Sequence, residues 1–166
     1  MKTTILIVLF FFLTSIMFSQ ETKKISKNGM SFEYPIDWIE RDIQGYLILL
    51  SEPAGKELTI MATFDVELDE KFKSVKDFYS NYKTKMKSSE MISEFKVKSK
   101  KEIKFKGYEA IEIYCSATLQ NLPTEWKSII FMKDEKIYKL TTTAMIGKFL
   151  LLKDKMDKVF ESFTFE

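Results

Sequence analysis

The feature that most constrains the fold is a change of hydrophobic period near the middle of the chain. Apolar residues alternate with polar ones through residues 58–68, and this alternation is typical of a β-strand with one buried face. The next apolar residues follow the i, i+3, i+4, i+7 spacing of an amphipathic helix: Val75, Phe78, Tyr79, Tyr82 and Met86. Ser74, with Asp77 three residues later, resembles a capping box and predicts where this helix begins. The chain therefore has to combine a sheet with at least one helix.

Alternation returns after this helix and predicts a series of strands, at residues 95–97, 103–105, 108–119, 125–132 and 137–143. Short polar turns such as Asp134-Glu135 join them, so we expect antiparallel pairing. A second helix is predicted over residues 147–161, because Phe149, Leu152 and Met156 have helical spacing.

The N-terminal third predicts shorter elements. Asn28-Gly29 is a strong hairpin signal, followed by a strand that ends at Pro35. We expect a helical turn over residues 36–40, a strand over residues 46–50 and a turn over residues 53–55. Together the patterns predict an α+β fold: an α/β/α sandwich with one core, a central mostly antiparallel sheet, an N-terminal hairpin and two flanking helices, at about 74–89 and 147–161.

The N-terminus predicts export. Lys2 precedes an apolar run over residues 5–18, which is followed by Ser19-Gln20; such a basic start, short apolar stretch and small residue describe a secretory signal peptide. The run is shorter than the about 20 residues of a spanning helix, although an uncleaved anchor is the alternative. We expect cleavage after Ser19 and a single domain over residues 20–166 without a membrane span. No cysteine lies near the cut, so a bacterial lipoprotein is excluded and the periplasm or the exterior is the expected location.

Composition excludes several kinds of chemistry. The chain has no histidine and one cysteine, Cys115, which rules out a Ser-His-Asp triad, a Cys-His pair, an internal disulfide and a Cys/His zinc site. Its 26 basic and 24 acidic residues give a formal net charge of +2, which argues against bulk electrostatic binding to nucleic acid. Cys115 alternates with apolar neighbours and is predicted to be a buried, inert thiol. We expect no catalytic residue, no cofactor and no metal site.

Four motifs resemble the PsbP-like and DcrB-like domains of the PsbP–Mog superfamily. Residues 29–38 read Gly-Met-Ser-Phe-Glu-Tyr-Pro-Ile-Asp-Trp, like the first hairpin and Tyr-Pro-x-x-Trp turn of these domains. The hairpin around Gly107, the strand over residues 136–143 and the Phe-Glu-Ser-Phe ending at residues 160–163 follow in the family's order. The resemblance covers residues 24–166.

This resemblance implies an α/β/α sandwich around an antiparallel sheet. It also implies protein binding rather than a reaction, since PsbP is an extrinsic subunit of photosystem II, Mog proteins bind a GTPase and DcrB-like members are bacterial envelope proteins. It implies no catalytic or metal-binding residue, because the matched motifs are turn and core positions.

A lysine-rich segment over residues 96–106, here called the lysine strand, is a candidate binding surface. It contains six lysines: Lys96, Lys98, Lys100, Lys101, Lys104 and Lys106. Alternation predicts that Lys96, Lys98 and Lys100 share one face. These lysines could form a patch for an anionic partner, such as an acidic protein, a polysaccharide or a lipid headgroup. The favoured interpretation is a solvated edge strand that lysine protects from aggregation.

The acidic run over residues 65–70 is a second candidate. Asp65, Glu67 and Asp69 are expected on the solvent face of one strand. Paired carboxylates can bind Ca²⁺ or act as acid and base, but the spacing lacks the rhythm of an EF-hand loop. A solvated strand end is the favoured interpretation.

Two tryptophans, Trp38 and Trp126, are the aromatic residues expected to touch a ligand in a groove. The sequence as a whole predicts an exported, non-catalytic envelope accessory protein that recognises another envelope or secreted protein through a sheet edge or a loop surface. The alternative is a binder of a small apolar or anionic ligand, in a pocket between sheet and helix near these tryptophans. The third hypothesis is a hydrolase that uses carboxylates.

Overall fold

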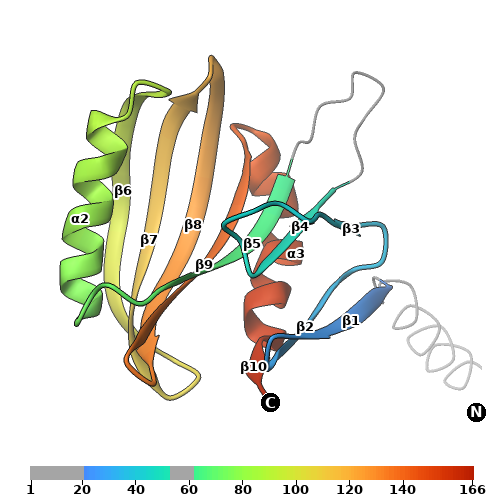
Figure 1. The fold of residues 1–166 in the computed structure, drawn as a ribbon. Helices are drawn as coiled ribbons and strands as arrows, with labels where there is room; N and C mark the ends of the chain where they lie inside the picture. The colour runs from blue at the N-terminus through green and yellow to red at the C-terminus, as the bar shows by residue number, and fades with distance from the viewer. Residues whose placement is uncertain (1–20, 53–61) are drawn as a thin grey trace, which may run out of the picture.

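Two antiparallel sheets and two helices make up the fold in the computed structural model, which describes residues 21–52 and 62–166 (Figure 1). The strands are β1 (Thr22–Lys27), β2 (Met30–Pro35), β3 (Ile39–Glu40), β4 (Ile48–Ser51), β5 (Ala62–Asp69), β6 (Ile92–Phe105), β7 (Tyr108–Leu119), β8 (Leu122–Lys133), β9 (Lys136–Met145) and β10 (Thr164–Phe165). The helices are α2 (Val75–Ser88) and α3 (Lys148–Ser162). The larger sheet has seven strands in the order β3-β4-β5-β9-β8-β7-β6, and the smaller has three in the order β1-β2-β10. The predicted fold class is confirmed.

The two helices cover opposite faces of the larger sheet, α2 beside β6 and α3 behind β5 and β9 (Figure 1). Phe78 of α2 shares a core with the β7 residues Ile113 and Cys115. The buried side of α3 packs instead against Phe64 and Val66 of β5. Alternate residues of the same strands therefore belong to different cores, because both sheet faces are covered. The sequence predicted one core, and the structure has two, separated by the sheet.

Local signals explain the element boundaries. The hydroxyl of Ser74 accepts a hydrogen bond from the backbone N–H of Asp77 at 3.1 Å, which is the predicted cap of α2. Asn28 and Gly29 both have positive φ, at 55° and 70°, as the predicted hairpin between β1 and β2 requires. Phe165 of β10 pairs with Met30 of β2, so the C-terminus closes the small sheet.

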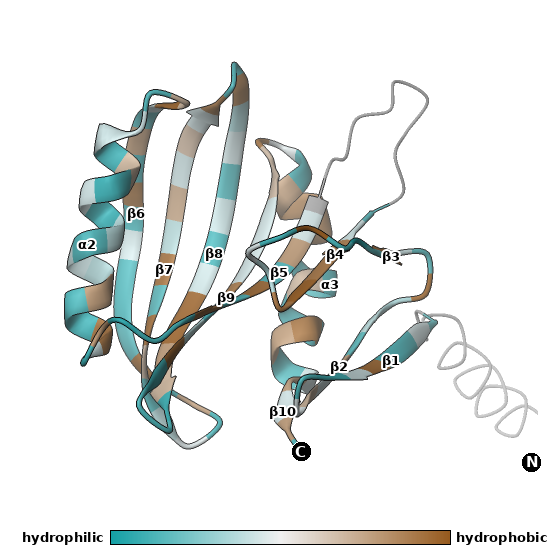
Figure 2. Cartoon of the chain, in the orientation of Figure 1, coloured by the Kyte–Doolittle hydropathy of each residue, from teal (hydrophilic) through white to brown (hydrophobic). Residues whose placement is uncertain are grey.

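Three predicted elements differ from the structure. The segments 95–97 and 103–105 belong to one long strand, β6, whose centre contains polar residues on both faces because it lies at the sheet edge. Residues 36–40 contain the short strand β3 rather than a helical turn, since Ile39 pairs with Ser51. Figure 2 shows α2 and β6 mainly in teal and white, the colours of hydrophilic and intermediate residues, whereas the brown of hydrophobic residues dominates β4.

Some predictions concern residues outside the described ranges: the signal peptide over residues 1–19, the turn over residues 53–55, and the first part of the alternating segment, residues 58–61. Within residues 21–52 and 62–166, no helix is both long enough and apolar enough to span a bilayer.

Candidate functional site

A polar cleft lies on the α2 side of the larger sheet, where the helix leaves part of the sheet uncovered. Its volume is about 250 Å³, and we call it the α2 cleft. The cross-strand pairs Asp65–Thr141 and Glu67–Lys139 place residues of β5 and β9 on this one face. The residues that line the cleft come from β5, β7, β8, β9, α2 and the loop before β4: Tyr46, Asp65, Glu67, Tyr82, Met86, Leu119, Trp126, Lys139, Thr141 and Thr143.

Trp126 and Tyr82 join the sheet to the helix at this cleft. The Trp126 Nε1–H donates a hydrogen bond to the Tyr82 hydroxyl at 2.8 Å, and Phe95 stacks on the indole with ring centroids 5.9 Å apart. Burial raises the pKa of Tyr82, so its phenol stays neutral. The Tyr82 hydroxyl accepts from Trp126 and keeps its own proton, which leaves it able to donate to a ligand.

Lys139 is held at the floor of the cleft. Its Nζ lies 2.6 Å from Glu67 Oε1 and 5.2 Å from the centroid of the Tyr82 ring. A carboxylate and an aromatic face thus both stabilise this ammonium group. The Glu67–Lys139 pair is internally neutral, so it adds polarity to the cleft without net charge.

Asp65 is the most unusual residue of the site. Its side chain is 6% exposed, and Oδ2 has no hydrogen-bond partner among the described residues. Burial raises the pKa of the Asp65 carboxyl to about 7; Lys139 opposes this rise and Glu67 adds to it. The predicted solvent exposure of Asp65 is wrong. Alternation does place it opposite the core residue Phe64, but neighbouring elements cover that second face as well.

The remaining sequence candidates separate in space. Glu67 lies in the α2 cleft beside Asp65, whereas the Asp69 carboxylate accepts a hydrogen bond from the backbone of Lys71 at 2.7 Å. Trp126 lines the cleft, but Trp38 is 1% exposed and lies in the core on the α3 side of the sheet. The structure therefore brings one of the two predicted groove tryptophans to a cavity and buries the other.

The lysine strand does not present its lysines on one face. Register shifts within residues 93–99 of β6 break the alternation. Lys98 forms an ion pair with Glu125 on the α3 side of the sheet, whereas Lys100 lies 4.9 Å from the ring centroid of Tyr79 on α2. The predicted shared face is wrong, because an irregularity that adds a residue to one strand reverses the side chains that follow it.

The other lysines of this strand are also dispersed. Lys104 lies 3.6 Å from Glu109 across the β6–β7 hairpin, and both side chains are exposed, so this pair contributes little to stability. The ammonium of Lys106 donates to the backbone carbonyl of Glu161. β6 is the last strand of the larger sheet, which is the position that the edge-protection interpretation requires.

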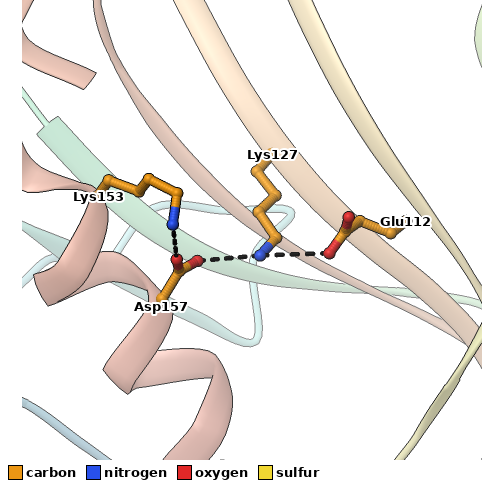
Figure 3. Close-up of polar contacts among 4 residues, drawn as sticks. All are labelled: Glu112, Lys127, Lys153 and Asp157. Atoms are coloured by element: carbon orange, nitrogen blue, oxygen red, sulfur yellow. Dashed lines mark hydrogen bonds and ion pairs between the residues drawn. The ribbon is translucent and has the colours of Figure 1, made fainter. Parts of the chain in front are cut away.

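Four charged residues form a second polar cluster between the sheet and α3 (Figure 3). Lys127 Nζ lies 3.2 Å from Glu112 Oε2 and 2.9 Å from Asp157 Oδ1, and Lys153 Nζ lies 2.5 Å from Asp157 Oδ2. Burial opposes ionisation of Asp157, but the hydrogen bonds from Lys153 and Lys127 outweigh it and hold the pKa of this carboxyl below its usual range. The cluster fastens α3 to β7 and β8.

We expect Lys127→Met to lower the free energy of unfolding at pH 7 by about 1 kcal/mol, because two half-buried carboxylates lose a shared donor. Asp157 has a lowered folded pKa, so its stabilising effect is present above its unfolded pKa and is lost as pH falls through the folded value. The difference between variant and parent should therefore shrink in acid. Urea unfolding at pH 7 and pH 2.5 measures it. Lys158→Met, at an exposed position of α3, is the control, and an equal loss in both variants would contradict the prediction.

Cys115 is fully buried in β7, as predicted. Burial raises the pKa of its thiol to about 12, so the thiol stays protonated near neutral pH. In the described ranges, no group of three or more Cys, Asp or Glu residues is arranged to hold a metal ion.

Sequence reasoning missed part of the cleft. Lys139, Thr141 and Thr143 were read only as a strand, and Tyr82 only as one apolar position of a helix. A signal was present, because Lys139, Thr141 and Thr143 make alternate positions of a central strand polar, and a central strand normally buries both of its faces.

The fold is that of an α+β sandwich whose helices lie on opposite faces of an antiparallel sheet. The sequence profile of PsbP-like proteins matches residues 15–165, and the chain therefore belongs to the PsbP-like family. A search of curated proteins finds no match.

Solved structures share this fold at low sequence identity. The cyanobacterial PsbP (CyanoP) from Synechocystis sp. PCC 6803 is 12% identical, with a TM-score of 0.67 over 91% of this chain and 96% of that one. LpqN, involved in cell envelope biogenesis of Mycobacterium tuberculosis, is 12% identical, with a TM-score of 0.60 over 87% and 90%. The Saccharomyces cerevisiae Ran-binding protein Mog1p is 8% identical, with a TM-score of 0.59 over 89% and 96%. At these identities the likeness shows the fold alone.

Proposed function

We propose that this protein is exported and acts in the cell envelope as a non-catalytic accessory protein that recognises another protein. The basic and apolar start of the sequence supports export. Two proteins with the same fold support the role: LpqN is involved in cell envelope biogenesis and Mog1p binds Ran. A carboxylate hydrolase, the third hypothesis from the sequence, has only Asp65 and Glu67 as candidates and stays a prediction.

The observation that carries the proposal is a group of exposed apolar side chains at one end of the larger sheet. Leu150 and Leu151, in the first turn of α3, are 71% and 79% exposed. The group, which we call the apolar end, also contains large exposed side chains from the α2–β6 turn, the first position of β8 and the turn after β9: Met91, Leu122 and Ile146. Clustered exposed apolar residues are typical of a protein-binding surface.

Hydrogen bonds show that the segments of the apolar end adjoin one another. The backbone N–H of Gln120, beside Leu122, donates to the carbonyl of Met91 at 3.1 Å. The N–H of Ile146 donates to the carbonyl of Pro123 at 3.0 Å. Figure 1 shows the α2–β6, β7–β8 and β9–α3 connections at the same upper end of the molecule. The surface therefore fits a partner with an apolar face of its own.

We expect Leu150→Asp combined with Leu151→Asp to weaken partner binding at least ~10-fold, because two carboxylates would lose water against an apolar partner face without gaining hydrogen bonds. The test is crosslinking in intact cells from position 151, identification of the captured protein, and measurement of its affinity for parent and variant. Crosslinking from Lys24, at the far side of the fold, is the control. Capture that is equal from both positions, or an unchanged affinity, would rule out this surface.

A further inference from the structure

The α2 cleft contains a carboxylate oxygen with no partner among the described residues, and this suggests a ligand beyond the proposed protein partner. Asp65 lines the cleft, is 6% exposed, and has no hydrogen bond to Oδ2 in residues 21–52 and 62–166. A buried carboxylate oxygen without a donor costs free energy, since it is removed from water without a compensating hydrogen bond. A group that brings a donor into the cleft would recover that cost.

The charges around Asp65 indicate which charge the ligand should carry. Among residues 21–52 and 62–166, Lys139 is the ammonium group that lines the cleft, and Glu67 already pairs with it at 2.6 Å. Ionised Asp65 therefore leaves one uncompensated negative charge. A ligand with one positive charge makes the cleft neutral, whereas an anion would add to the imbalance. The alternative function predicted from the sequence was binding of a small apolar or anionic ligand, and the charges of the cleft favour a cation instead.

The walls of the cleft suit an organic cation. Tyr46, Tyr82 and Trp126 supply aromatic surface, and the Lys139 ammonium already lies over the Tyr82 ring. Aromatic faces attract alkylammonium and guanidinium groups. The volume of about 250 Å³ is below the range of drug-sized pockets, about 300–1,000 Å³, and is suited to one short chain with a charged end.

We propose that the α2 cleft binds a small organic cation, an alkylammonium or guanidinium group, which donates hydrogen bonds to Asp65 while its apolar part contacts Trp126 and Met86. The cation is either a free amine or the side chain of a Lys or Arg residue in a peptide. Both sources present the same chemistry to Asp65, and the experiment below distinguishes them.

The probes are n-butylammonium and n-butylguanidinium, with neutral n-butylurea as the matched control. The readout is the ¹H–¹⁵N signal of each tryptophan indole in the full chain. Trp126 lies in the cleft and Trp38 lies in the opposite core, so one molecule contains both reporter and reference. We expect both charged probes to shift the Trp126 signal saturably without moving the Trp38 signal, and n-butylurea to bind at least ~10-fold more weakly, because the neutral probe cannot make charge-assisted hydrogen bonds to Asp65.

A blocked Gly-Lys-Gly tripeptide distinguishes the two sources of the cation, a free amine and a side chain of a peptide. If it binds at least as tightly as n-butylammonium, the cleft accepts a lysine side chain from a protein. If only the free amine binds, the ligand is a small molecule. Both results support the proposal. Shifts that are equal for n-butylurea and the charged probes, or absent for all of them, overturn it.

Asp65→Asn is expected to weaken binding of the charged probes at least ~10-fold, whereas Glu109→Gln, at an exposed carboxylate far from the cleft, should leave it unchanged. If Asp65→Asn does not fold, the parent chain supplies the same test through pH. Asp65 faces Glu67 of β5, Lys139 of β9, Tyr82 of α2 and Tyr46 of the loop before β4. Burial raises the Asp65 pKa to about 7, so the carboxylate is mostly protonated at pH 5 and ionised at pH 8.5.

Both probes stay positively charged at these two pH values, since amines and guanidines of this kind titrate above about pH 10. Binding should therefore be at least ~10-fold tighter at pH 8.5 than at pH 5. Equal affinities at the two pH values overturn the proposal. Failure of the proposed cation binding would leave the protein-binding role intact, because that role is tested at the apolar end and not at the cleft.

Discussion

Replacing Phe131 with alanine is expected to lower the free energy of unfolding by about 3–5 kcal/mol. Phe131 is fully buried in β8, on the α3 side of the sheet. Its ring centroid lies 5.4 to 6.4 Å from those of five other aromatic residues: Phe105, Tyr108, Tyr138, Phe163 and Phe165. Phe165 belongs to β10, so the same cluster joins the small sheet to the large one. The variant loses buried area, leaves a cavity and weakens that connection.

Urea unfolding followed by far-UV circular dichroism measures this effect. Leu151→Ala is the control, because it removes an apolar side chain that is exposed, and its effect should stay within about 0.5 kcal/mol. Phe131→Leu should fall between the two, since it keeps most of the apolar volume. A loss below about 1 kcal/mol for Phe131→Ala would mean that the cluster does not hold the sheets together.

Local periodicity was sufficient to predict most of the fold. The strand at residues 108–119 has the predicted bounds, and both ends of each helix lie one residue from the predicted positions. Their patterns are clear because the aliphatic residues of β7 lie mostly on one face and each helix buries one face. β6 was divided in two because a long edge strand can expose polar residues on both sides, and its hydrophobic pattern is then interrupted. Small shifts in pairing register produce no sequence signal of their own, so the split of the lysine strand was not predictable.

The candidate site was predicted only in fragments. The acidic run and Trp126 were both identified, but separately, because sequence spacing does not reveal that β5 and β8 are both neighbours of β9. Asp65 was assigned to solvent because a charged residue opposite an apolar face is usually exposed. What distinguishes Asp65 is the covering of its face by residues far away in sequence, among them Tyr82 of α2. Such long-range burial follows from topology and not from any local pattern.

Reversing the charge of Lys98 is expected to destabilise the protein much more than the same change at its neighbour Lys96. The Glu125 side chain is 8% exposed and accepts hydrogen bonds from Lys98 and from the Tyr114 hydroxyl. Burial opposes ionisation of Glu125, but these two hydrogen bonds outweigh it and lower its pKa. Lys98→Glu would remove one donor and place a second carboxylate beside a buried one. We expect a loss of about 3 kcal/mol, because a charge-assisted hydrogen bond worth about 1.5–3 kcal/mol is replaced by repulsion.

Lys96→Glu is the matched control, since Lys96 is exposed on the same edge strand and lies opposite Ser116 of β7, and its effect should stay within about 0.5 kcal/mol. Urea unfolding at pH 7 compares the two variants. The Glu125 pKa is lowered in the folded protein, so its stabilising effect is lost as pH falls through that value, and the gap between the variants should narrow in acid. Equal stability of the two variants would mean that Lys98 is only a solvated edge lysine. An unequal result means that binding of an anionic partner by the lysine strand has to be tested at Lys96 and Lys101, because a change at Lys98 would confuse lost binding with lost folding.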